Sequence, residues 1–194
     1  MFGGENKELD KFADLLEKGV TGLFFERGEI KFSAPVTKEK RQIIDYHGKM
    51  RAAGMEKFNN TPTYVAAVNY FANQRDMEKK LPVGALIVYV EQSYLKPLMT
   101  LLRYPAIDDE NEDAMLDSCG TLGNILAGRF KSEIASAGYV ELEMSAFETY
   151  RNSAISGIAF CEKEYHMYEL KFTIDKLKRM VIEMTMGAVP RRAK

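Results

Sequence analysis

Four short or polar residues recur on one face of the longest helical segment that the sequence predicts, residues 112–137. At about 100° per residue they fall within an arc of about 60°: Asp117, Thr121, Asn124 and Gly128. The opposite side carries apolar residues, namely Met115, Cys119, Leu122, Leu126, Phe130 and Ala137. Short side chains in place of Lys and Glu are unusual on a solvent-facing helix. The chemistry predicted for this face is therefore close contact with a neighbouring element or with a partner molecule.

Glycine is frequent in the same segment. Gly120, Gly123 and Gly128 together disfavour a helix by on the order of 2–3 kcal/mol relative to alanine. Tight packing within the fold explains this spacing, and so does a surface that a partner approaches closely. The sequence leaves both interpretations open.

The run DSCGTLGNILAGRFKSEIASAG, residues 117–138, resembles the signature helix of the CheC/CheX/FliY chemotaxis phosphatases and is most similar to that of CheX. The family motif has an acidic residue or Ser, then Glu, then Asn, then a hydrophobic pair and a small residue followed by Gly. Asp117, Asn124 and residues 125–128 stand in register with it. The run GALIVYVEQSYLKPLMTLL is similar to the family's preceding strand and helix.

The resemblance implies binding of a phosphorylated CheY-like response regulator and hydrolysis of its aspartyl phosphate. In this interpretation Asn124 orients a water in line with the phosphorus, and Asp117, Thr121 and Gly128 flank the docking surface. Phosphoryl transfer depends mainly on positioning and charge stabilisation, and a carboxamide donates and accepts hydrogen bonds at once. The receiver itself would supply Mg²⁺, so we expect no cofactor and no metal site of this chain's own. The resemblance also implies a homodimer.

Two positions depart from the family pattern. Thr121 stands where the family has a Glu that pairs with a lysine of the receiver. Losing one partner of such a pair costs about 2–5 kcal/mol, which means roughly 30-fold to several-thousand-fold weaker engagement. Asp117, one turn earlier, is a candidate substitute, and Phe147 stands where the family has Pro. The alternative prediction is therefore a non-catalytic receiver-binding or dimerisation module with a degenerate phosphatase site.

Composition excludes several other classes of protein. Lys and Arg number 27 against 28 Asp and Glu, so the basic excess typical of nucleic-acid binding is missing. No apolar run approaches about 18 residues, and we expect a cytoplasmic protein without membrane insertion. Cys119 and Cys161 lack the spacing of a disulfide framework or metal site, and Cys119 is expected in the core. His47 and His166 are expected to be structural or exposed.

The remaining pattern predicts an α+β fold, with a mainly antiparallel sheet and long helices packed on one face. We expect one domain over residues 1–194, in which about 60–175 resemble the family, 1–59 diverge and 188–194 form a basic tail. The predicted strands are 64–72, 83–91, two short ones within 22–32, and three within 139–150, 156–163 and 167–174. The other predicted helices are 5–18 with a stop at Gly19, 37–53, 93–104 and 175–186.

Overall fold

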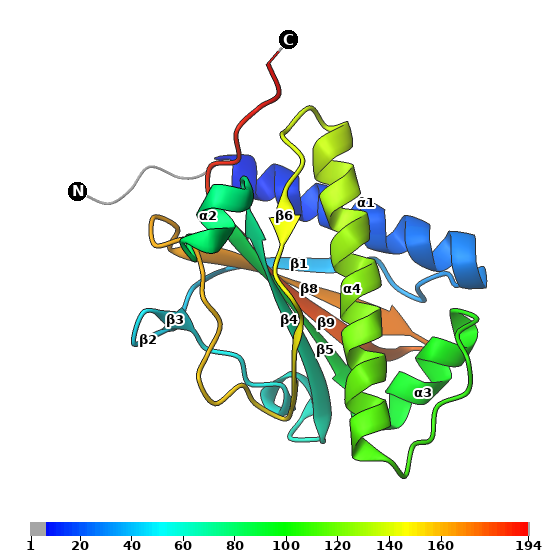
Figure 1. Ribbon diagram of the computed structural model, residues 1–194. Helices are drawn as coiled ribbons and strands as arrows, with labels where there is room; N and C mark the ends of the chain where they lie inside the picture. Colours follow the sequence, from blue (N-terminus) through cyan, green and yellow to red (C-terminus); the bar gives the residue numbers. More distant parts are fainter. Residues whose placement is uncertain (1–6, 194) are drawn as a thin grey trace.

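The computed structural model describes residues 7–193, in which a seven-stranded antiparallel sheet carries its long helices on one face (Figure 1). The strand order is β1-β8-β9-β5-β4-β6, and β7 also pairs with β4. The predicted α+β class is confirmed. The sheet consists of β1 (Thr37–Gln42), β4 (Thr63–Phe71), β5 (Gly84–Glu91), β6 (Glu143–Met144), β7 (Glu148–Arg151), β8 (His166–Ile174) and β9 (Leu177–Met186). The other elements are α1 (Lys7–Gly28), β2 (Asp45–Tyr46), β3 (Lys49–Met50), the 3-10 helix η1 (Met55–Phe58), α2 (Gln74–Glu78), α3 (Gln92–Leu101) and α4 (Glu112–Ser136).

Alternate residues of the central strands bury on opposite faces of the sheet. On β5, Leu86, Val88 and Val90 join the core beneath α1, α3 and α4, whereas Ile87 and Tyr89 join a smaller core on the other face. Residues 43–62, including the β2–β3 hairpin and η1, cover part of that second face. Burial on both faces explains why these strands read as nearly continuous apolar runs. Within residues 7–193, no helix has the length and apolarity needed to cross a bilayer.

The first helix is longer than the sequence predicts. Gly19 does not end it, and α1 continues to Gly28 through the segment predicted as a strand pair. The reason is tertiary, because a Cβ on Gly19 would lie 3.2 Å from Cγ of Glu133 and 3.4 Å from Cγ of Arg129. Glycine at this position lets α1 approach α4 closely and does not end the helix.

The basic stretch at residues 37–53 is not the predicted helix but contains β1, β2 and β3. Most side chains of β1 are charged, as is typical of an edge strand, and ion pairs hold these side chains in place. Lys38 Nζ lies 2.5 Å from Asp14 of α1, and Lys40 Nζ lies 3.1 Å from Asp10. The edge strand is thereby fastened to α1.

The predicted last helix, residues 175–186, is the strand β9, joined to β8 by a two-residue turn. Asp175 and Lys176 adopt φ values of +51° and +63° in this turn. β9 lies between β8 and β5, so its side chains bury on both faces and lose the alternation that marks a strand. Residues 156–163 were predicted as a strand but form only an isolated bridge between Ile158 and Met50.

Candidate functional site

Helix α4 is fixed at both ends and along its inner side. The Asn111 side chain caps its first turn by accepting a hydrogen bond from the Ala114 amide at 3.2 Å. Gly138, with φ of +93°, follows its end, as predicted. The buried Tyr70 of β4 donates a 3.0 Å hydrogen bond to the Ala127 carbonyl. The predicted apolar face packs on the sheet through Met115, Cys119, Leu122, Leu126 and Phe130.

The structure brings the four predicted site residues to the outer face of α4. The side chains of Asp117, Thr121 and Asn124 are exposed, and Gly128 is half-buried. Among residues 7–193, the Asn124 carboxamide makes no hydrogen bond and the Asp117 carboxylate no ion pair. We call these four residues the outer stripe. Its donors and acceptors are free for a second molecule.

The glycines of α4 divide into two kinds. A Cβ on Gly123 would lie 2.8 Å from Cβ of Ala66 on β4 and 3.1 Å from Cε1 of Phe147, so this glycine serves packing within the fold. A Cβ on Gly120 would lie 3.2 Å from Cγ2 of Thr149. A Cβ on Gly128 would meet no heavy atom within 4 Å. Packing within the fold therefore accounts for Gly123, whereas the described fold gives no packing reason for glycine at position 128.

The charges around the outer stripe are mostly negative at its N-terminal end. Asp108, Glu110 and Asp113 are exposed there and form no ion pair with any residue in the described range. Glu112 is held by Arg151 of β7 at 3.3 Å. Carboxylates at a helix N-terminus interact favourably with the helix dipole, and they also attract a basic surface of a partner.

The outer stripe can bind and orient but offers no nucleophile activated by a neighbouring base. The Cys119 thiol is fully buried on the opposite side of α4, and burial raises its pKa to about 12. The prediction that Cys119 belongs to the core is confirmed. His47 is exposed on the β2–β3 hairpin, and His166 lies half-buried at the start of β8. The exposed polar side chains of the outer stripe are the carboxylate of Asp117, the hydroxyl of Thr121 and the carboxamide of Asn124.

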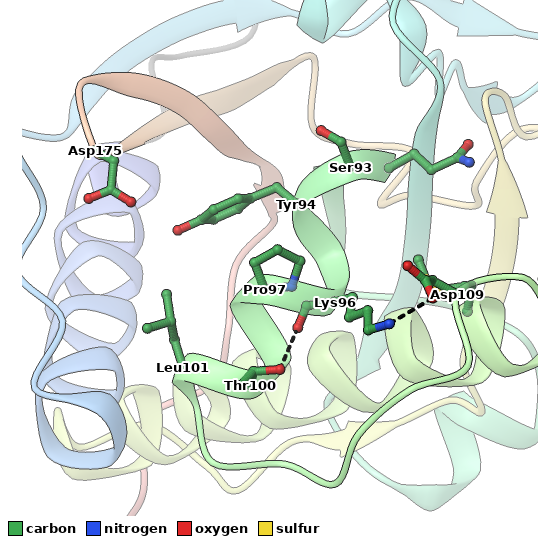
Figure 2. A pocket seen from close by; sticks show the side chains of 10 residues that line it. Ser93, Tyr94, Lys96, Pro97, Thr100, Leu101, Asp109 and Asp175 are labelled. Atoms are coloured by element: carbon green, nitrogen blue, oxygen red, sulfur yellow. Dashed lines mark hydrogen bonds and ion pairs between the residues drawn. The ribbon is translucent and has the colours of Figure 1, made fainter.

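A concavity, which the sequence did not indicate, lies beside α4. It has a volume of about 660 Å³ and is lined by α3, by Asp109 of the α3–α4 connection, by Met115 of α4 and by Asp175 of the β8–β9 turn (Figure 2). Residues of four separate segments contribute to it, so no single motif could have predicted it.

Comparison with solved structures defines the class of fold. A CheC-like superfamily protein from Shewanella sp. PV-4 aligns with a TM-score of 0.58 and 12% identity over 91% of this chain and 97% of that one. Chemotaxis protein CheX from Vibrio vulnificus aligns with a TM-score of 0.56 and 13% identity over 90% and 97%. CheX in the CheX-CheY-BeF3-Mg+2 complex from Borrelia burgdorferi aligns with a TM-score of 0.55 and 9% identity over 91% and 98%.

The chain therefore has the CheC-like fold. More particularly, it is the fold shared by the CheX and FliY chemotaxis proteins, and the resemblance seen in the sequence is confirmed at this level. No protein-family model and no curated protein sequence matches the chain.

Proposed function

We propose that this protein binds the receiver domain of a phosphorylated CheY-like response regulator through the outer stripe and promotes hydrolysis of its aspartyl phosphate. One observation carries the proposal: the Asn124 carboxamide is exposed in the middle of α4 and makes no hydrogen bond within residues 7–193. The similarity of the fold to CheX in a complex with CheY supports the choice of partner.

The chemistry asked of Asn124 is positioning. A water held by the carboxamide attacks the phosphorus, the bond between phosphorus and the receiver's aspartate oxygen breaks, and phosphate leaves with the attacking oxygen. The amide accepts one hydrogen bond from the water and donates another to the phosphoryl group, which fixes the direction of attack. Charge stabilisation falls to Mg²⁺ and the lysine on the receiver, because the outer stripe carries no cation.

A second candidate function is favoured by Thr121, whose hydroxyl cannot replace the charge of the family's Glu. In this version the protein binds a receiver without dephosphorylating it. Asp117 lies one turn earlier on the same exposed face, and its carboxylate forms no ion pair with any residue between 7 and 193. It is the candidate to contact the receiver's lysine in either version.

The two functions are separated by timing phosphate loss from an acyl-phosphorylated receiver. The receivers to test are the response-regulator domains encoded by the source organism. In the catalytic version the wild type accelerates loss, and Asn124→Ala lowers the acceleration by about a hundredfold while binding persists. Ser136→Ala, three turns further along α4, is the matched control and should act like the wild type.

In the non-catalytic version the wild type binds without acceleration. If only the charge is missing, Thr121→Glu then creates activity. Failure to bind any receiver, phosphorylated or not, contradicts both versions.

We also propose that the protein is a cytoplasmic homodimer, as the resemblance implies. The charged side chains of β1 discourage pairing at that edge of the sheet, and β4 is covered by β6 and β7. A dimer therefore needs another contact or a rearranged edge. Sedimentation that shows a monomer at micromolar concentration contradicts this proposal.

A further inference from the structure

A different cavity lies on the second face of the sheet, over the end of β4. Its volume of about 560 Å³ falls in the usual range of roughly 300–1,000 Å³ for a ligand site. The floor consists of Ala67, Asn69 and Phe71, since alternate residues of a strand point to the same face, and Ala67 belongs to the core on that face. The loop at residues 156–159 and the connection between β6 and β7 form two of the sides. We call this the second-face cavity.

Hydrogen bonds hold the loop of the second-face cavity in place. Met50 and Ile158 exchange two backbone hydrogen bonds of 2.7 and 2.8 Å, which fix the loop beside β3. The Asn69 side chain donates from Nδ2 to the Ala159 carbonyl at 2.7 Å and to the Gly84 carbonyl at 3.2 Å, which fixes the loop to the sheet. A wall that is already ordered costs a small ligand little conformational entropy on binding.

The same hydrogen bonds determine which end of the Asn69 carboxamide is free. Because Nδ2 donates to two carbonyls, Oδ1 lies on the other side of the planar group. Oδ1 accepts no hydrogen bond from residues 7–193 and is not fully buried. The floor of the second-face cavity therefore offers an accessible acceptor to a ligand.

Two exposed lysines line the second-face cavity, Lys49 of β3 and Lys80 after α2. Both also line a neighbouring cavity of about 770 Å³, so they stand where the two cavities meet. Neither ammonium forms an ion pair or a hydrogen bond with any residue in the described range. Lys80 has a φ of +55°, which favours glycine or asparagine, so the backbone gives no reason for lysine there. Two cations without partners beside one cavity favour an anionic ligand.

The carboxylates nearby do not reverse this charge. In the second-face cavity the two lysines stand against one carboxylate, that of Glu148, which accepts a hydrogen bond from the Tyr150 hydroxyl. The neighbouring cavity is balanced, because three lysines and three carboxylates line it. The excess of cations therefore belongs to the second-face cavity. The rest of its wall is mostly apolar and includes Phe71, Met77 and Ile158.

We propose that the second-face cavity binds a small organic anion with an apolar body. The carboxylate or phosphate of the ligand contacts Lys49 and Lys80, its body packs on Phe71 and Ile158, and an N–H or O–H group donates to Asn69 Oδ1. An inorganic ion would leave the apolar wall uncovered, and a neutral or cationic ligand would leave the lysines without partners. The cavity lies on the face of the sheet opposite α4, so this inference does not depend on the proposed function.

N-acetyl-L-phenylalanine is the probe, because it combines a carboxylate, an amide N–H and an aromatic body. It is titrated into the full chain while the backbone amide signals of Asn69 and Ala159 are followed by NMR. The neutral control of the same shape is N-acetyl-L-phenylalaninamide. We expect saturable binding with a Kd of about 1 mM, as ligands of this size reach, and about tenfold weaker binding of the amide. Failure of the probe to saturate, or equal binding of the amide, would overturn the proposal.

Two further ligands define the chemistry of the site. 3-Phenylpropionate lacks the amide N–H and should bind several-fold more weakly than the probe. Equal binding would overturn the part assigned to Asn69. 2-Phenylethyl phosphate presents a phosphate on a similar body, and its affinity relative to that of 3-phenylpropionate shows which of the two anions the lysines favour.

Variants of the two lysines test where the probe binds. Lys49→Gln and Lys80→Gln should each weaken binding of the probe several-fold. Lys79→Gln makes the same change of charge one residue from Lys80 but outside the lining of both cavities, and it should bind the probe like the wild type. All three lysines are exposed and form no ion pair within residues 7–193, so thermal unfolding should show three folded proteins of unchanged stability. Unchanged binding by both cavity variants, or equal weakening by Lys79→Gln, would overturn the proposal.

Discussion

Replacing Gly128 with alanine tests the outer stripe most directly, because the fold does not require glycine there. A Cβ at this position meets no heavy atom within 4 Å. Alanine favours a helix over glycine by about 1 kcal/mol, so Gly128→Ala should stabilise the protein by about that amount and raise Tm by about 2–4 °C. The same methyl lies where the partner is proposed to approach. Receiver binding should therefore weaken by about tenfold, or about 1.4 kcal/mol.

Gly123→Ala is the matched control on the same helix. Its Cβ would lie 2.8 Å from Cβ of Ala66 and 3.1 Å from Cε1 of Phe147. Overpacking of this kind costs about 1–3 kcal/mol and outweighs the helical gain, so this variant should lose on the order of 1 kcal/mol. Thermal unfolding followed by circular dichroism and receiver binding followed by calorimetry measure both effects. A destabilised Gly128→Ala, or one that binds the receiver as tightly as the wild type, refutes the reasoning.

Three further predictions concern the rest of the fold. Lys57→Met should lower the unfolding free energy by about 3–5 kcal/mol, because its ammonium contacts two buried carboxylates of β8 and β9. Lys18→Met removes an exposed lysine and leaves its partner Glu133 paired with Arg129, so it should cost about 1 kcal/mol or less in the same denaturant titration, and equal losses would contradict the contrast. Hydrogen bonds from Lys171 and then Arg41 lower the pKa of Glu39 from 4.5 to about 2, so its contribution to stability is present above pH 4.5 and is lost as the pH falls through about 2. Glu39→Gln should flatten the fall of Tm in that window, and an unchanged profile would count against the ion pairs. The buried Cys119 thiol should react with a thiol reagent only on unfolding, and rapid labelling of the native protein at this position would show an open core.

The central elements could be predicted because their local signals agree with the tertiary structure. The predicted strands at 64–72 and 83–91 correspond to β4 and β5, and the helices at 93–104 and 112–137 correspond to α3 and α4. Each has a long apolar pattern, and turn residues or caps stand at its ends. Met180, Met184 and Met186 are buried in the core as parts of the strand β9, although their segment was predicted as a helix.

The failures occur where packing overrides a local signal. Glycine at position 19 predicts the end of a helix, but in the structure it lies inside α1, where α1 packs closely against α4. The 37–42 segment has a helical composition, yet α1 and β8 hold its charges in an edge strand. In β9, Glu183 lies at the centre of the sheet and is tolerated because Lys57 and Tyr89 bind its carboxylate. No local sequence pattern could predict these two partners of Glu183, because both lie more than ninety residues away from it in the chain.

The sequence by itself determined the outer stripe, since a helix of fixed period must align Asp117, Thr121, Asn124 and Gly128. It also determined which face of that helix enters the core. Only the tertiary structure decided that the stripe faces solvent, that Gly123 serves the sheet and Gly128 does not, and that Tyr94 and Asp175 share a cavity. The physical reason is that periodicity acts over a few residues, whereas exposure and close packing depend on segments joined by the fold alone.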